Sequence, residues 1–188
     1  MSVNIAKTGT VYAGSDSIDK NLLIDTLKDV GKTHTSYNVA DFNFSESLVS
    51  GNKYTIIAKV NTSTEKKSIN FYHSGGSYNM SSWLSISNDG IYKVTFTATS
   101  NMSSQTSGAG HGFCRVYVSN NTGNQGSTSV TGSANVEWIK IYAGEADSMW
   151  TPNEADSYFV TNYHGFIEDD DIANIFEGHV EANQFYEI

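Results

Sequence analysis

Apolar and polar residues alternate in several short runs of the central part of the chain, and such alternation is the pattern of half-buried β-strands. In the run 91–97, Val94 and Phe96 share one face, whereas Lys93 and Thr95 share the other. Comparable runs, rich in β-branched and aromatic residues, lie at 55–60, 69–72, 113–118 and 136–141. One-sided burial of several such strands predicts two antiparallel sheets packed face to face.

Clusters of turn-forming residues separate these runs, at 50–52, 74–76, 88–90 and 120–123. Short strands at this spacing are typical of an all-β sandwich or barrel. The length of 188 residues suits one such domain plus extensions. We expect an N-terminal segment over 1–20, a β-sandwich over 21–152 and an acidic C-terminal tail over 153–188.

The formal net charge of -9 argues against general binding to nucleic acid or to anionic membranes, because both require an excess of Lys and Arg. No Lys or Arg follows Lys140, so the acidic residues gather in the last quarter of the chain. We interpret this stretch as a solvated surface, with a basic partner or bound cations as alternatives. The start lacks a signal-peptide pattern and no run is long enough to span a membrane, so we expect synthesis in a cytoplasm.

Catalytic and metal-binding patterns are missing from the sequence. The histidines are scattered, the acids of the strand-rich region are sparse, and no phosphate loop, nucleophile elbow or zinc spacing is present. Cys114, the single cysteine, lies in an apolar run and is expected to be buried. The acidic run 168–171 could hold a structural Ca²⁺, but helix capping by Asp171 is preferred. We therefore predict no enzyme, no catalytic residue and no required cofactor.

Aromatic side chains are the strongest candidates for ligand contact, because the apolar face of a sugar stacks on a ring while its hydroxyls bond polar neighbours. Burial in the core is an equal alternative for Trp83, and cover by the tail or a neighbouring subunit is one for Trp138. The candidate glycan-binding residues are Tyr72, His73, Tyr78, Trp83, Tyr117 and Trp138.

Several short motifs occur in the order of a known module: Asn21-Leu22-Leu23, the segments 50–55, 90–96 and 136–144, and then Trp150-Thr151-Pro152. In this order they resemble the carbohydrate-binding-module-like (galactose-binding-like) jelly rolls of phage minor structural, tail, baseplate and fibre proteins. The resemblance covers residues 21–152 and implies an antiparallel jelly-roll β-sandwich. It also implies a place in the virion, on a head fibre, tail fibre or baseplate.

The two ends of the chain share a Gly-x-Val-x-Ala pattern, at 9–13 and 178–182, and short segments similar to these occur in phage fibre proteins. Both alternate apolar with polar residues, as an edge strand does, and neither can bury its apolar side alone. We predict that both ends dock the chain to other subunits. The candidate assembly residues are Val11, Ala13, Val180, Ala182, Phe185 and Ile188.

These observations predict an oligomeric virion appendage, trimeric by resemblance, whose sandwich displays a glycan-binding surface for attachment to a host polysaccharide. Expected partners are further copies of the chain, other virion proteins and that polysaccharide. The alternative is a capsid or tail decoration or spacer protein without glycan binding. A glycan-degrading enzyme is the third hypothesis, and no motif supports it.

Overall fold

The computed structural model describes residues 3–5, 11–13, 20–75, 78–86, 90–122, 131–153, 155 and 156. The chain divides into two compact units, one with residues 1–17 and 156–188 and one with residues 18–155. In the first unit, β1 (Val3–Ile5) and β2 (Val11–Ala13) form an antiparallel pair with Val3 opposite Ala13. Val11 and Ala13 therefore lie on a strand that already has a partner in its own chain, and their assembly role stays a prediction.

The regular secondary structure described in the larger unit is mostly β-strand. One turn of helix, α1 (Ser100–Ser103), follows β8; Thr99 caps its N-terminus by accepting from the backbone N–H of Met102. The strands are β3 (Asn38–Asn43), β4 (Lys53–Thr62), β5 (Ser68–His73), β6 (Tyr78–Asn79), β7 (Leu84–Ser85), β8 (Ile91–Thr97), β9 (Phe113–Ser119) and β10 (Ala134–Ala143).

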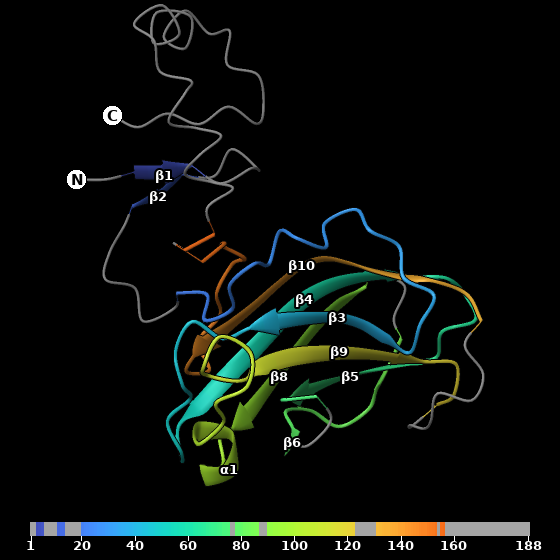
Figure 1. Ribbon diagram of the computed structural model, residues 1–188. Helices are drawn as coiled ribbons and strands as arrows, with labels where there is room; N and C mark the ends of the chain where they lie inside the picture. The colour runs from blue at the N-terminus through green and yellow to red at the C-terminus, as the bar shows by residue number, and fades with distance from the viewer. Residues whose placement is uncertain are drawn as a thin grey trace, which may run out of the picture. The chain divides into compact units, whose positions relative to one another are not determined.

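These strands form two antiparallel sheets (Figure 1). One has the order β10-β4-β8, and the other has the order β3-β9-β5-β6 with β7 also paired to β5. Consecutive long strands lie in opposite sheets, as in a jelly roll: β3, β5 and β9 belong to one, β4, β8 and β10 to the other. The predicted all-β, antiparallel β-sandwich is confirmed.

All of the strands predicted from alternation are present, within β4, β5, β8, β9 and β10. β3 was not predicted, because its six residues include two Asn and one Asp, which are uncommon in strands. It pairs with β9 along most of its length, with a register shift between Asn38 and Ala40. Pairing to a neighbouring strand thus overrides a weak local preference.

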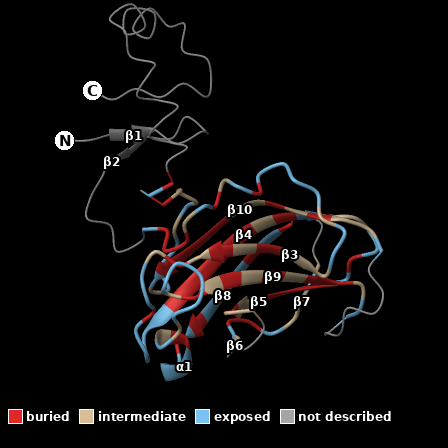
Figure 2. Cartoon of the chain, viewed as in Figure 1, coloured by how far each residue is buried: buried red, intermediate tan, exposed pale blue. Residues whose placement is uncertain are grey.

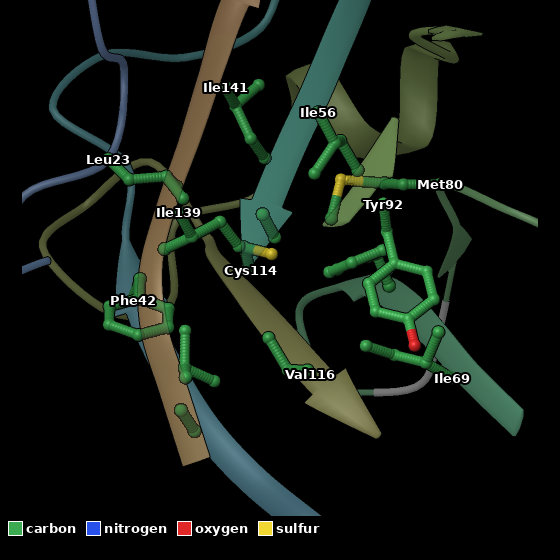
Figure 3. Close-up of a cluster of buried hydrophobic side chains, with 14 of the residues drawn as sticks. Leu23, Phe42, Ile56, Ile69, Met80, Tyr92, Cys114, Val116, Ile139 and Ile141 are labelled. Atoms are coloured by element: carbon green, nitrogen blue, oxygen red, sulfur yellow. The ribbon is translucent and has the colours of Figure 1, made fainter. Parts of the chain in front are cut away.

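The core lies between the two sheets and draws on both (Figures 2 and 3). Ile56 of β4 and Ile139 of β10 are fully buried on one side, and Ile69 of β5 and Val116 of β9 on the other. Cys114 is also fully buried, as predicted, and burial raises the pKa of its thiol well above the usual range. It is a small apolar core residue that stays protonated.

The buried amide of Asn21 joins the start of the sandwich to its end. Its Nδ2 donates to the carbonyl oxygens of Ile139 (3.1 Å) and Thr151 (3.0 Å), and its Oδ1 accepts from the backbone N–H of Ile141 (3.2 Å). The carbonyl oxygen of Asn21 accepts in turn from Nδ2 of Asn153 (2.5 Å). The opening Asn-Leu-Leu and the closing Trp-Thr-Pro motifs are thus neighbours in space.

The segment that follows β10 is held by buried Lys140, which is 1% exposed. Its Nζ donates to Oγ of Ser148 (2.8 Å), the carbonyl oxygen of Met149 (3.0 Å) and Oγ1 of Thr151 (3.0 Å). Three acceptors offset much of the cost of taking an ammonium group out of water.

Two acids of the same segment make surface ion pairs with lysines of the three-stranded sheet. Glu145 pairs with Lys53 at 2.9 Å, and Asp147 pairs with Lys93. Exposed pairs of this kind stabilise a fold only weakly, because water and salt screen the two charges. Within the residues that the structure describes, no helix has the length and apolar character needed to span a membrane.

Candidate functional site

The outer face of the five-stranded sheet carries a group of aromatic and charged side chains. Along β9 the burial alternates: Cys114, Val116 and Val118 point into the core, whereas Arg115 and Tyr117 face outward and are half-buried (Figure 2). The antiparallel register extends this outer row to the neighbouring strands, since Arg115 lies between Asp41 of β3 and Tyr72 of β5.

Four rings contact one another on this face. Tyr37 and Tyr117 are stacked, with ring centroids 4.6 Å apart, and Tyr72 meets Tyr117 edge-on at 5.1 Å. Trp83, from the segment between β6 and β7, lies 5.9 Å from Tyr37. Each such pair contributes about 0.5–1.5 kcal/mol beyond its buried area, so the rings hold one another in place. We refer to Tyr37, Tyr72, Trp83 and Tyr117 as the aromatic patch.

Arg115 lies beside the aromatic patch in a fixed position. Asp41 accepts two hydrogen bonds from it, Oδ1 from Nε at 2.6 Å and Oδ2 from Nη2 at 2.5 Å. The guanidinium lies 5.2 Å from the centroid of Phe113 and 5.8 Å from that of Tyr117, and its Nη1 donates to the Tyr117 hydroxyl at 3.4 Å. The carboxylate raises the pKa of Arg115 further, so the guanidinium stays charged.

The tyrosine hydroxyls supply polar groups to the aromatic patch. Burial, followed by the proximity of Tyr72 and Tyr117, raises the pKa of Tyr37 to about 12. Its hydroxyl therefore stays protonated at neutral pH and can donate a hydrogen bond. Oδ1 of Asn38, which lies opposite Tyr117 in the sheet, is buried without a hydrogen-bond partner among the described residues.

Three of the six glycan-binding candidates, Tyr72, Trp83 and Tyr117, are brought together in the aromatic patch. Tyr78 lies on β6, packs against the core and accepts a hydrogen bond from Nε2 of Gln105 at 3.5 Å. Tyr78 is therefore not part of the aromatic patch.

His73 differs from its predicted place at the surface, since it is 0% exposed. Its ring stacks on Phe44 at 4.9 Å, Nδ1 bonds the Ser74 hydroxyl at 2.9 Å, and Nε2 has no hydrogen-bond partner. Burial lowers the pKa of His73 to about 4. The physical reason is strand alternation: His73 follows Ile69 and Phe71 at steps of two, which places it on the core face.

Trp138 is on the other sheet, in β10, and does not join the aromatic patch. Its ring lies 6.4 Å from that of Trp150, whose Nε1 donates to the carbonyl oxygen of Ile139 at 3.1 Å. Trp150, which lies before the predicted tail at 153–188, thus contacts Trp138, and cover of Trp138 by that tail or by another subunit stays a prediction. The candidate assembly residues Val180, Ala182, Phe185 and Ile188 lie outside the described residues, as does the acidic run 168–171.

Sequence reasoning missed Tyr37, Asp41 and Arg115. The alternation of Phe113, Arg115 and Tyr117 around buried Cys114 was a usable signal, because it places a cation between two rings on one face. The part played by Asp41 depends on the register of β3 against β9, for which the sequence offers no local signal. Within the described part of the chain, no group of three His, Cys, Asp or Glu residues could hold a metal ion.

Comparison with known proteins gives distant structural similarity to carbohydrate-binding modules. No family model matches the chain, and no curated protein matches it. The C-terminal CBM6 module of LamC, a marine laminarinase from Zobellia galactanivorans, is 12% identical, with 65% of this chain and 99% of that module covered at a TM-score of 0.35. The C-terminal domain of EclA, a sugar-binding protein, is 13% identical, with 73% of this chain and 87% of that domain covered at a TM-score of 0.34. At these scores the likeness carries no argument about function.

Proposed function

We propose that this protein is a carbohydrate-binding β-sandwich that acts without catalysis, and that the aromatic patch is its binding surface. The observation that carries the proposal is the group of four rings on the outer face of one sheet, beside a fixed Arg115–Asp41 pair. Half-buried rings offer an apolar surface to the C–H face of a sugar, and the neighbouring hydroxyl and amide groups match its hydroxyls.

The biological setting that we propose is a phage virion appendage, either a head fibre, a tail fibre or a baseplate component, that attaches to host surface polysaccharide. The order of the motifs from Asn21 to Pro152 supports it, through the resemblance to phage structural modules. A single shallow surface binds a glycan weakly, so attachment requires several copies of the chain on one particle. This setting predicts self-association and contact with other virion proteins.

A second candidate function is a structural decoration or spacer protein that binds no glycan. Tyr, Trp and Arg are also the residues that dominate protein–protein interfaces, and all three types meet in and beside the aromatic patch. In that case a neighbouring subunit covers the rings. The two functions differ in whether the rings are accessible in the assembled protein.

Binding to a panel of soluble polysaccharides, measured by affinity gel electrophoresis of the full chain, tests the proposal. We expect at least one polysaccharide to retard the protein. Tyr72→Ala should lower the affinity obtained from that retardation about tenfold, since one stacked ring contributes on the order of 1–2 kcal/mol. Trp138→Ala alters a half-buried ring of the other sheet and is the matched control, expected to bind as the wild type does. Loss of binding in Trp138→Ala with full binding in Tyr72→Ala would show that the site lies on the three-stranded sheet and not at the aromatic patch.

A further inference from the structure

The five-stranded sheet that carries the aromatic patch is poor in charge. On its described strands β3, β5, β6, β7 and β9, the side chains charged at neutral pH are Asp41 and Arg115 alone. These two form one bidentate ion pair, which leaves no net charge on the strands around the rings. This balance contrasts with the chain as a whole, whose formal charge is -9.

The ion pair also occupies the edge of the guanidinium that best recognises a carboxylate. An arginine binds a carboxylate most strongly through two parallel N–H donors, and Arg115 directs Nε and Nη2 to Asp41. Its Nη1 is directed to the Tyr117 hydroxyl at 3.4 Å. A second carboxylate at this place would either displace Asp41 or lie next to it, and like charges at such distances repel.

The remaining groups of the surface suit uncharged ligands. The Tyr37, Tyr72 and Tyr117 hydroxyls are neutral groups that donate and accept hydrogen bonds, as sugar hydroxyls do. We infer that the aromatic patch selects neutral saccharides over acidic ones, and that the pairing of Asp41 with Arg115 sets this selectivity. The inference rests on the proposed glycan binding and adds the chemical class of the glycan.

Removing the carboxylate charge tests the inference. In Asp41→Asn the side chain keeps its size and can still accept a hydrogen bond from Arg115, but the charge of the guanidinium is no longer balanced. The full chain and its variants are titrated with two sets of polysaccharides, one neutral (dextran, galactomannan and arabinoxylan) and one acidic (polygalacturonate, alginate and hyaluronan). Thermal unfolding of each variant verifies that it is folded.

We expect the wild type to bind a member of the neutral set and none of the acidic set. Asp41→Asn is expected to gain at least about tenfold in affinity for an acidic polymer, because charge-assisted hydrogen bonds are roughly twice as strong as neutral ones. That gain should disappear as salt is raised, since salt screens surface charges.

Glu137→Gln is the matched control. Glu137 pairs with Lys59 at 3.0 Å and bonds Asn61 on the three-stranded sheet, so its replacement changes the total charge by the same amount on the other sheet. It is expected to gain nothing for acidic polymers. The double variant Asp41→Asn, Arg115→Gln carries neither charge at the aromatic patch, and should lose the gain that the single variant shows.

Three results would contradict the inference in distinguishable ways. Stronger binding of wild type to acidic than to neutral polymers would overturn the selectivity while the proposed function stands. An equal gain in Asp41→Asn and Glu137→Gln would assign the preference to total charge instead of the ion pair. If the folded wild type binds no polymer of either set, the proposed function fails and the selectivity fails with it.

Discussion

At the scale of single residues, His73 is a buried base on the core face of β5. Its ring is stacked on Phe44, and its Nε2 has no hydrogen-bond partner. A Cβ added at Gly112 would lie 2.3 Å from Cε1 of His73, so the chain passes very close to the ring. A proton added to this imidazole would bring an uncompensated charge into the core.

His73 should make the protein less stable in weak acid. Its pKa is lowered to about 4 in the fold, against an ordinary value of 6.5, so the unfolded chain takes up the proton first as pH falls. The effect is absent above pH 6.5, grows as pH falls towards 4, and reaches roughly 3 kcal/mol below it. His73→Phe keeps a ring against Phe44 and has no titrating nitrogen.

Urea unfolding of the wild type and of His73→Phe between pH 7 and pH 4 measures this effect. The difference in unfolding free energy between the two proteins should shift in favour of the variant across this range. A difference that is constant with pH would show that His73 does not titrate differently in the folded and unfolded chains.

The residue types of the candidate site could be predicted, but their grouping could not. Tyr72, Trp83 and Tyr117 stood out because rings are the side chains that stack on sugars. Asp41 joins them only through the register of β3 on β9, which is a contact between distant parts of the chain. The burial of His73 could have been predicted, since positions 69, 71 and 73 are two residues apart and therefore share one face of the strand.

At the scale of the elements, the sandwich is closed by contacts between its first and last segments. Asn21 bonds backbone groups of β10 and of the segment after it, and Lys140 bonds three acceptors in that segment. Asn21 and Lys140 were noted in the sequence only as part of a motif and as the last basic residue. Their roles depend on where the segment after β10 lies, which alternation within strands does not determine.

Asn21→Ala should destabilise the larger unit by about 2–4 kcal/mol, because it leaves buried backbone carbonyl and N–H groups without partners. Asn52→Ala, at an exposed turn between Gly51 and β4, is the matched control and should cost less than about 0.5 kcal/mol. Chemical denaturation of both variants gives the comparison. Equal costs for the two variants would rule out Asn21 as the residue that joins the ends of the sandwich.

Lys140→Met should loosen the segment after β10 while the sheets remain intact. The acceptors of Ser148, Met149 and Thr151 lose a charged donor, which is a loss on the order of 1–3 kcal/mol. Amide hydrogen exchange over residues 144–151 should become faster. Lys59→Met removes a half-exposed lysine that pairs with Glu137, and is expected to leave that exchange unchanged.

At the scale of the whole molecule, the sequence was sufficient to predict the fold class. Alternating strands, turn clusters and motif order all pointed to an antiparallel sandwich, and the sheets have that arrangement. The oligomeric state and the place in a virion stay predictions, since they depend on segments beyond the sandwich. Only the pairing of β1 with β2 is described there.

Val180→Asp tests whether the C-terminal segment drives assembly. We expect the wild type to run as a trimer in light scattering after size exclusion, and the variant to run as a monomer, because a charge on the apolar side of a docking strand opposes its burial. Asn183→Asp introduces the same charge at a polar position and should remain trimeric. Identical masses for the wild type and Val180→Asp would leave the docking hypothesis without support.

Glycan binding at the aromatic patch is tested most directly by the tryptophan indole signals in a two-dimensional NMR spectrum. The chain has three tryptophans, of which Trp83 lies in the aromatic patch, whereas Trp138 and Trp150 contact each other by the other sheet. The full chain is titrated with an oligosaccharide of the polysaccharide that retards it, and Trp83→Phe assigns the signals. We expect the Trp83 indole signal to shift while the other two stay fixed. A shift of the Trp138 and Trp150 signals alone would show that the glycan does not bind at the aromatic patch.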